Sequence, residues 1–156
     1  MSDRENTGND LGKLIERVRE ATGALMQGDV RRYFALVNEA DDFTLMPPTG
    51  GPTRHGVDVS PASLEALEMF FAGGGDGDFE LEQELASGEL AVLVGVERQR
   101  GPVGGLPDQD WSLRVTLVFR REESDWRLVH RHADALVREI TMEQLSLLAR
   151  GSVEPS

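Results

Sequence analysis

The chain has 156 residues and a net charge of −12, with 28 acidic against 16 basic side chains. A chain of this length is expected to fold as one domain around one core. Nucleic acids bind proteins largely through cations that meet phosphates. So acidic a chain would repel them, and we expect no nucleic acid partner.

The residue types that are missing exclude several chemistries. The sequence contains no cysteine, which excludes disulfides, thiol nucleophiles and thiolate metal sites. Lys13 is the only lysine, so Schiff-base chemistry is not expected, and we predict no cofactor. No apolar run approaches the roughly 20 residues of a transmembrane helix, and the polar start shows no secretory signal. We therefore expect no membrane partner and a cytoplasmic location.

Three helices are predicted in the first half of the chain. Residues 1–9 form a predicted disordered tail, and apolar residues at helical spacing predict a helix over 10–27. Gly28 and Asp29 end it and open a second helix, whose inner face is Val30, Tyr33, Phe34 and Val37. A short strand, "FTLMP", and a turn-rich loop follow. Ser60 as N-cap and Pro61 at the first helical position begin a third helix, with the predicted buried stripe Leu64, Leu67, Phe70 and Phe71.

The second half alternates with the twofold period of strands. In "DFELEQELA" Phe79, Leu81 and Leu85 alternate with glutamates, and the apolar "ELAVLVGVERQR" suits a central strand. "WSLRVTLVFRR" and "WRLVHRHADALV" are two further strands joined by the short turn "EESD", which predicts an antiparallel hairpin.

The end of the chain predicts one more helix. Thr141 and Gln144 have the spacing of a capping box, and Ile140 and Leu145 that of a hydrophobic staple. We expect a short helix to about Arg150, and a tail over 151–156. Helices followed by an antiparallel meander indicate an α+β fold. We predict a single domain over 10–150, with helices on one face of a strongly curved sheet and a cavity between the layers.

The order helix, "GDVRRYFALVNEADDFTLMPPTG", "RHG", helix, then strands ending in "LRVTLVFRREESDWRLVHRHAD" resembles the nuclear transport factor 2-like superfamily. This is the cone-shaped fold of ketosteroid isomerases and SnoaL-like polyketide cyclases. The likeness is greatest to small bacterial domains akin to the association domain of calcium/calmodulin-dependent protein kinase II. In that domain a tryptophan opens the last strand and two alternate histidines follow, as Trp126, His130 and His132 do here. "GGLP", at 104–107, occupies a comparable loop.

Which face of the last strand lines the cavity depends on the hairpin. A two- or four-residue loop puts Phe119 on the same face as Leu128 and His130, whereas a three-residue loop with a bulge pairs it with Val129 and Arg131. The resemblance favours the second option, because arginines line the kinase-domain pocket. It implies that Arg131 faces the cavity, while Trp126, His130 and His132 lie on the outer face, where related domains dimerise.

Several side chains are candidates for a ligand site. Arg131 is the expected polar anchor for a ligand with a carboxylate or enolate oxygen, because an arginine among apolar residues needs a polar partner. The other candidates are Tyr33, Arg98, Trp111, Val115 and Phe119. Core packing is the alternative for the aromatic residues, and solvation the alternative for Arg98. Arg54 and His55 could close over the mouth of the pocket.

His130 and His132 have four competing interpretations. Packing at a sheet face or a dimer interface is the first, and contact with a ligand is the second. In the third, His132 is a general base oriented by Asp134, since histidine titrates near neutral pH. Metal binding is the last: the two side chains lie about 7 Å apart on a strand, but no third ligand is evident, so we predict no metal.

Three classes of function remain open from the sequence. An isomerase of the ketosteroid type needs a carboxylate base in an apolar pocket. None of the residues expected to face inward is acidic; these are Val92, Val94, Val96, Leu113, Val115, Leu117 and Phe119. Glu97 would face inward only if the two faces of its strand were exchanged. The leading hypothesis is a homodimeric domain that binds a small organic ligand. The alternatives are an enzyme, such as a polyketide cyclase, isomerase or dehydratase, and an oligomerisation module.

Overall fold

A computed structural model describes residues 2–149, with the backbone alone for 2–7 and 9; the predicted tail at 151–156 lies outside the described residues. The helices and strands follow one another as α1 (Ser2–Met26), α2 (Val30–Val37), β1 (Glu39–Met46), β2 (Arg54–His55), α3 (Pro61–Phe70), β3 (Asp76–Ser87), β4 (Leu90–Gly101), the 3-10 turn η1 (Val103–Gly105), β5 (Gln109–Asp110), β6 (Leu113–Glu122), β7 (Asp125–Ala135) and α4 (Met142–Leu148). Among the described helices, none is long and apolar enough to cross a membrane.

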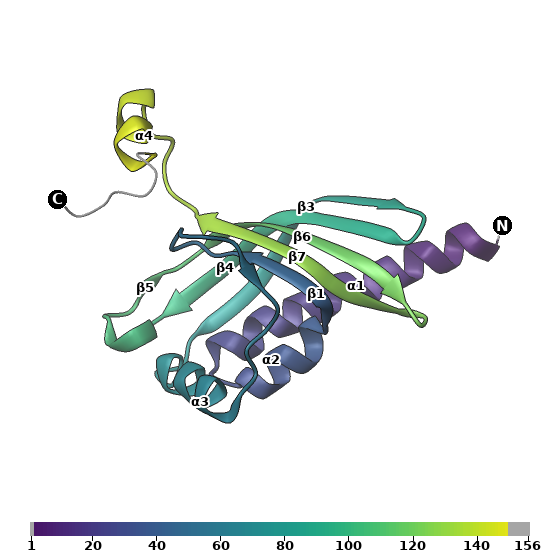
Figure 1. The fold of residues 1–156 in the computed structure, drawn as a ribbon, viewed down its shortest axis with the longest axis horizontal. Coiled ribbons are helices and arrows are strands. Elements are labelled where there is room, and N and C mark those ends of the chain that lie inside the picture. The colour runs from purple at the N-terminus through teal and green to yellow at the C-terminus, as the bar shows by residue number, and fades with distance from the viewer. Residues whose placement is uncertain (1, 150–156) are drawn as a thin grey trace.

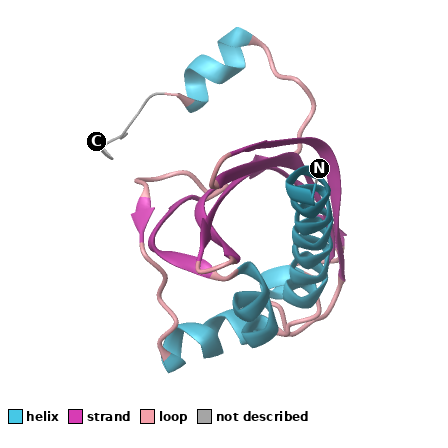
Figure 2. Ribbon diagram, turned by 90° about the vertical axis from the view of Figure 1, so that its right-hand side faces the viewer, coloured by secondary structure: helices cyan, strands magenta, loops and turns pink. Residues whose placement is uncertain are grey.

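The strands form one curved, unclosed sheet in the order β2-β1-β7-β6-β4-β3, with β5 on the edge of β4. Figure 2 looks along α1 and shows the sheet curling around this helix, while α2 and α3 lie at one end (Figure 1). This confirms the predicted α+β fold. The meander from β3 to β7 is antiparallel, but β1 runs parallel to β7 because the chain enters it from the helical layer rather than through a hairpin.

The first two helices pack as their sequence pattern predicts. In α1 the apolar stripe is buried against the sheet at Leu11, Leu14, Ile15, Val18 and Ala21. The helix begins at Ser2, within the segment 1–9 for which we predicted a disordered tail. In α2, Val30 and Val37 are buried, and Tyr33 and Phe34 pack against the core.

Helix α3 has the predicted start but not the predicted burial. The Ser60 hydroxyl accepts from the backbone N–H of Ser63. None of the residues of α3 is fully buried, and Phe70 is 50% exposed. The predicted buried stripe is therefore wrong. The reason is the position of the helix, which packs along one edge on α2 and η1 and does not lie across the sheet.

The last hairpin combines both alternatives left open by the sequence. Its turn is the two-residue loop Glu123 and Ser124, both with positive φ, as a tight hairpin turn requires. Phe119 therefore pairs with Leu128. Val118 pairs with His130, which leaves Val129 as the extra residue of a bulge.

The bulge divides the last strand into two parts of opposite parity. Trp126 and Leu128 face the core before it, and Arg131 and Ala133 face inward after it. His130 and His132 pair with Val118 and Thr116 on the outer face. The assumption that Trp126, His130 and His132 share one face is wrong, because a single extra residue reverses the alternation.

The register of β4 reverses the predicted set of inward residues on that strand. Directly opposed residues share a face, and Ala91, Leu93 and Glu97 oppose the inward side chains Phe119, Leu117 and Leu113. Val92, Val94 and Val96, which we expected inside, are therefore on the outer face. The expected inward residues of β6 are confirmed.

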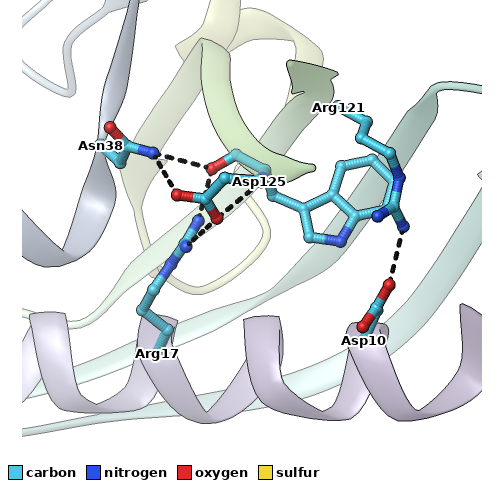
Figure 3. Close-up of polar contacts among 6 residues, drawn as sticks. Asp10, Arg17, Asn38, Arg121 and Asp125 are labelled. Atoms are coloured by element: carbon cyan, nitrogen blue, oxygen red, sulfur yellow. Dashed lines mark hydrogen bonds and ion pairs between the residues drawn. The ribbon is translucent and has the colours of Figure 1, made fainter. Parts of the chain in front are cut away.

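Hydrogen bonds and ion pairs connect the tip of the last hairpin to α1 and to the end of α2 (Figure 3). Arg17 donates to Asp125 at 2.9 Å and to the carbonyl of Trp126 at 2.7 Å, and Asn38 donates to the same two acceptors. Arg121 lies 4.4 Å from the centre of the Trp126 ring and pairs with Asp10. Trp126 is 5% exposed. It packs inside its own chain and offers little surface for the dimer contact that we expected of it.

Helix α4 projects away from the cone (Figures 1 and 2). Its capping box is formed by Thr141 and Gln144 as predicted. The helix ends at Leu148, and Arg150 lies outside the described residues. Its apolar side chains are largely exposed, with Met142 at 78% and Leu148 at 76%.

Candidate functional site

A cavity of about 530 Å³ lies between the helices and the inner face of the sheet. Most of its wall is apolar, supplied by Phe34, Phe43, Leu45, Leu67, Phe71 and Leu113. Its polar groups are Tyr33, Glu39, Gln99 and Arg131, and Arg54, His55 and Asp58 lie at the rim formed by β2 and the loop after it. A mostly apolar pocket with a few converging polar groups is typical of small-molecule sites.

Arg131 lies in the cavity wall as predicted, but it already has a carboxylate partner. Its two terminal nitrogens donate to the two carboxylate oxygens of Glu97, each at 2.6 Å, and the side chains are 12% and 5% exposed. Gln99 donates to the same carboxylate at 3.4 Å. Burial is the largest single effect and would lower the pKa of Arg131, but the charge and hydrogen bonds of Glu97 together with Tyr33 and Glu39 raise it. This is a bidentate, buried ion pair.

Glu39 is the functional candidate that sequence reasoning missed. Asn38 ends α2 in a left-handed conformation, with φ 54°, and Glu39 then opens β1. Arg127 donates to the backbone carbonyl of Glu39 at 2.8 Å and fixes its position. Burial raises the pKa of its carboxyl from 4.5 to about 7, although nearby Arg131 acts in the opposite direction. The carboxyl group therefore changes charge near neutral pH.

Tyr33 faces the same polar region from α2. Burial, only partly offset by Arg131, raises the pKa of its hydroxyl to about 12, so the group remains a neutral donor. Among the described residues, neither this hydroxyl nor the Glu39 carboxyl has a hydrogen-bond partner within the protein. Both groups are therefore available to a ligand. A signal for Glu39 existed in the sequence, namely an acidic residue at the start of a strand beside the inner face of α2.

The histidines of the last strand lie outside this cavity. His130 is hydrogen-bonded through Nδ1 to the hydroxyl of Thr44 at 2.7 Å. His132 is exposed in a groove of about 370 Å³ on the outer face. Asp134 accepts two bonds from Arg114, at 2.9 and 2.6 Å, and this pairing lowers its pKa. His132 and Asp134 therefore do not form a general base inside the cone, and that interpretation is wrong.

The remaining predicted ligand residues lie apart from the cavity. Arg98 forms a surface ion pair with Glu80, and Trp111 donates to the carbonyl of Gly101. Val115 and Phe119 belong to the core, at 3% and 1% exposed. Of the six predicted ligand residues, Arg131 and Tyr33 line the cavity. Over the described residues, no three histidine or acidic side chains are grouped as metal ligands would be.

Helices packed into a curved sheet around a cavity define the nuclear transport factor 2-like class of proteins. The model of the SnoaL-like domain family matches residues 15–137. The chain belongs to this family. A search of curated proteins found no match.

Solved structures show the same fold. A nuclear transport factor 2-like protein with a cystatin-like fold from Novosphingobium aromaticivorans is 18% identical, with a TM-score of 0.69 and 94% of each chain covered. A nuclear transport factor 2-like protein of unknown function from Pseudomonas putida is 25% identical, with a TM-score of 0.63 and coverages of 90% of this chain and 92% of that one. A Xanthomonas campestris protein named for the calcium/calmodulin-dependent protein kinase II association domain is 20% identical, with a TM-score of 0.56 and coverages of 74% and 80%.

Proposed function

We propose that this protein binds a small organic ligand in the cavity, with an apolar body against the phenylalanines and leucines and a polar group against Tyr33, Glu39 and Arg131. The observation that supports this most is the pair of unpartnered polar groups, Tyr33 and Glu39, at the side of an apolar space of about 530 Å³. Half-buried polar groups without protein partners are costly. A ligand that supplies those partners recovers this cost.

Calorimetric titration with 1-naphthylacetamide, which has an aromatic body and one amide, tests this proposal. Leu67→Trp places a larger side chain in the cavity wall from α3 and should abolish binding. Leu90→Trp is the matched control, because Leu90 lies at the far end of β4 and is 47% exposed. Equal binding by both variants would place the ligand elsewhere and contradict the proposal.

A second candidate function is catalysis of proton transfer. The specific observation is Glu39, whose carboxyl is open to the cavity with a pKa raised to about 7 by burial. A general base is most effective when its pKa is near the working pH. Tyr33 would donate to the oxygen of a carbonyl substrate while Glu39 removes a proton from the adjacent carbon, and the oxygen would gain negative charge as the C–H bond breaks.

Exchange of the acidic C–H protons of 2-tetralone for deuterium, followed by NMR in D2O, tests this second function. The wild-type protein should accelerate exchange above the buffer rate, and Glu39→Gln should not. Tyr33→Phe should retain only part of the acceleration. Acceleration that survives Glu39→Gln would exclude Glu39 as the base.

We also propose that the domain is a homodimer through the outer face of the sheet. Val92, Val94 and Val118 lie on this face beside Thr116 and the two histidines, and no described helix covers it. Val94→Glu should give a monomer in sedimentation at micromolar concentration, whereas Met69→Glu, at a position of α3 that is 73% exposed, should leave the dimer intact. A wild-type monomer at that concentration would contradict this.

A further inference from the structure

The cation in the wall of the cavity is paired with a carboxylate of its own chain. Arg131 directs both terminal nitrogens at Glu97, in two parallel bonds of 2.6 Å. Two parallel bonds of this kind match a guanidinium to a carboxylate in both charge and shape. A carboxylate on a ligand would meet a cation whose charge Glu97 already offsets, and it could form the same two parallel bonds only by displacing Glu97, whose side chain is 5% exposed.

The other charged groups around the cavity do not add a free positive charge in its interior. Glu39 contributes a negative charge when it ionises, and Arg131 and Glu97 cancel each other. At the rim, the positive charge of Arg54 is balanced in number by the negative charge of Asp58. The Asp58 carboxylate accepts hydrogen bonds from Ser60 and Ser63 at the turn before α3. His55 lies beside them. The interior is therefore neutral or negative, never positive.

From this geometry we infer that the cavity selects uncharged ligands and excludes carboxylates, and that Glu97 is the residue that sets this selection by occupying Arg131. This inference rests on the proposed ligand-binding function and names the class of ligand for that site. It reverses the sequence-based expectation that Arg131 anchors an anionic ligand. Glu97 acts through Arg131 and is a positioning residue.

Two nearly isosteric probes, 1-naphthylacetamide and 1-naphthylacetate, test the inference by calorimetry at pH 8. The wild-type protein should bind the amide about tenfold or more tightly than the acetate, because the acetate loses hydration and meets Glu39 without a free cation. If neither probe binds, the proposed function itself fails. If both bind with similar affinity, ligand binding stands and selection by charge is wrong.

The variant Glu97→Gln frees the guanidinium of Arg131. The acetate should then gain about tenfold or more in affinity while the amide changes by less than about threefold, since only the acetate can form the charged pair. A gain that depends on charge is not what simple loss of structure would produce. Failure of the acetate to gain in a folded Glu97→Gln protein would overturn the role of Glu97.

Two further variants keep the test decisive. Glu97→Gln can disturb folding by leaving a buried cation unpaired; the double variant Glu97→Gln with Arg131→Gln removes both charges and should bind the amide but still exclude the acetate. Arg54→Gln should leave the preference for the amide unchanged. If Arg54→Gln changed the preference for the amide over the acetate by about tenfold or more, the rim and not Glu97 would govern anions, and the inference would fall.

Discussion

Replacing Glu39 by Gln should make the protein more stable at pH 8 and leave its stability at pH 4 nearly unchanged. The folded protein holds the Glu39 proton up to about pH 7, whereas the unfolded chain releases it near pH 4.5. The stability that protonated Glu39 contributes is therefore fully present below about pH 4.5 and is lost as the pH rises through 7. Glutamine resembles the protonated form and does not titrate.

The expected gain in stability at pH 8 can be calculated from the pKa shift of Glu39. Each pKa unit corresponds to about 1.4 kcal/mol, so the rise from 4.5 to about 7 sets a ceiling of about 3.5 kcal/mol. Glu39 is only half-buried, and solvent screening reduces the expected gain to about 1–2 kcal/mol. A carboxyl group that destabilises its own fold at neutral pH is expected where function requires it.

Urea denaturation of the wild-type protein and Glu39→Gln at pH 4 and pH 8 measures this difference. The free energies of unfolding should agree at pH 4, and the variant should be more stable at pH 8, with equal m-values. Asp41→Asn is a control on an exposed acidic residue of the same strand and should show no such gain. Parallel pH dependence in the wild-type protein and Glu39→Gln would refute the burial of a titrating carboxyl at this position.

Three more substitutions test the fold around the site. Phe119→Ala removes a core side chain that is 1% exposed and should cost about 3–5 kcal/mol in urea unfolding; a cost below 1 kcal/mol would be incompatible with the described core. Gly95→Ala would place a Cβ 2.3 Å from the carbonyl oxygen of Glu80, so cooperative thermal unfolding should be lost or begin at a much lower temperature than in the wild-type protein. Arg17→Ala removes the ion pair with Asp125 and should lower the free energy of unfolding by about 1–3 kcal/mol. Amide hydrogen exchange should become faster only at the tip of the last hairpin, and faster exchange throughout the chain would contradict a local role for Arg17.

Local signals in the sequence predicted the helices well. Ser60 and Thr141 cap helices where their spacing to the next residues indicated, because capping depends on groups within one turn. The burial of α3 could not be predicted in the same way. It depends on where the end of the cone lies, which is set by contacts between distant parts of the chain.

The cavity was predicted only in part for the same reason. Arg131 was placed correctly, and this rested on the family resemblance. The bulge at Val129 depends on β7 pairing with β6 on one side and with β1 on the other, which no local pattern reports. The parity of β4 likewise depends on its register, and with it the inward position of Glu97. The cytoplasmic location stays a prediction.

The most direct test of the ligand site is an NMR titration of the ¹⁵N-labelled protein with 1-naphthylacetamide. Backbone amide shifts should change around the cavity, at Tyr33, Val57, Leu67 and Arg131, and stay constant on the outer face at Thr116 and Val118. Shifts confined to the outer face, or absent at millimolar probe, would contradict the account of the cavity as the functional site.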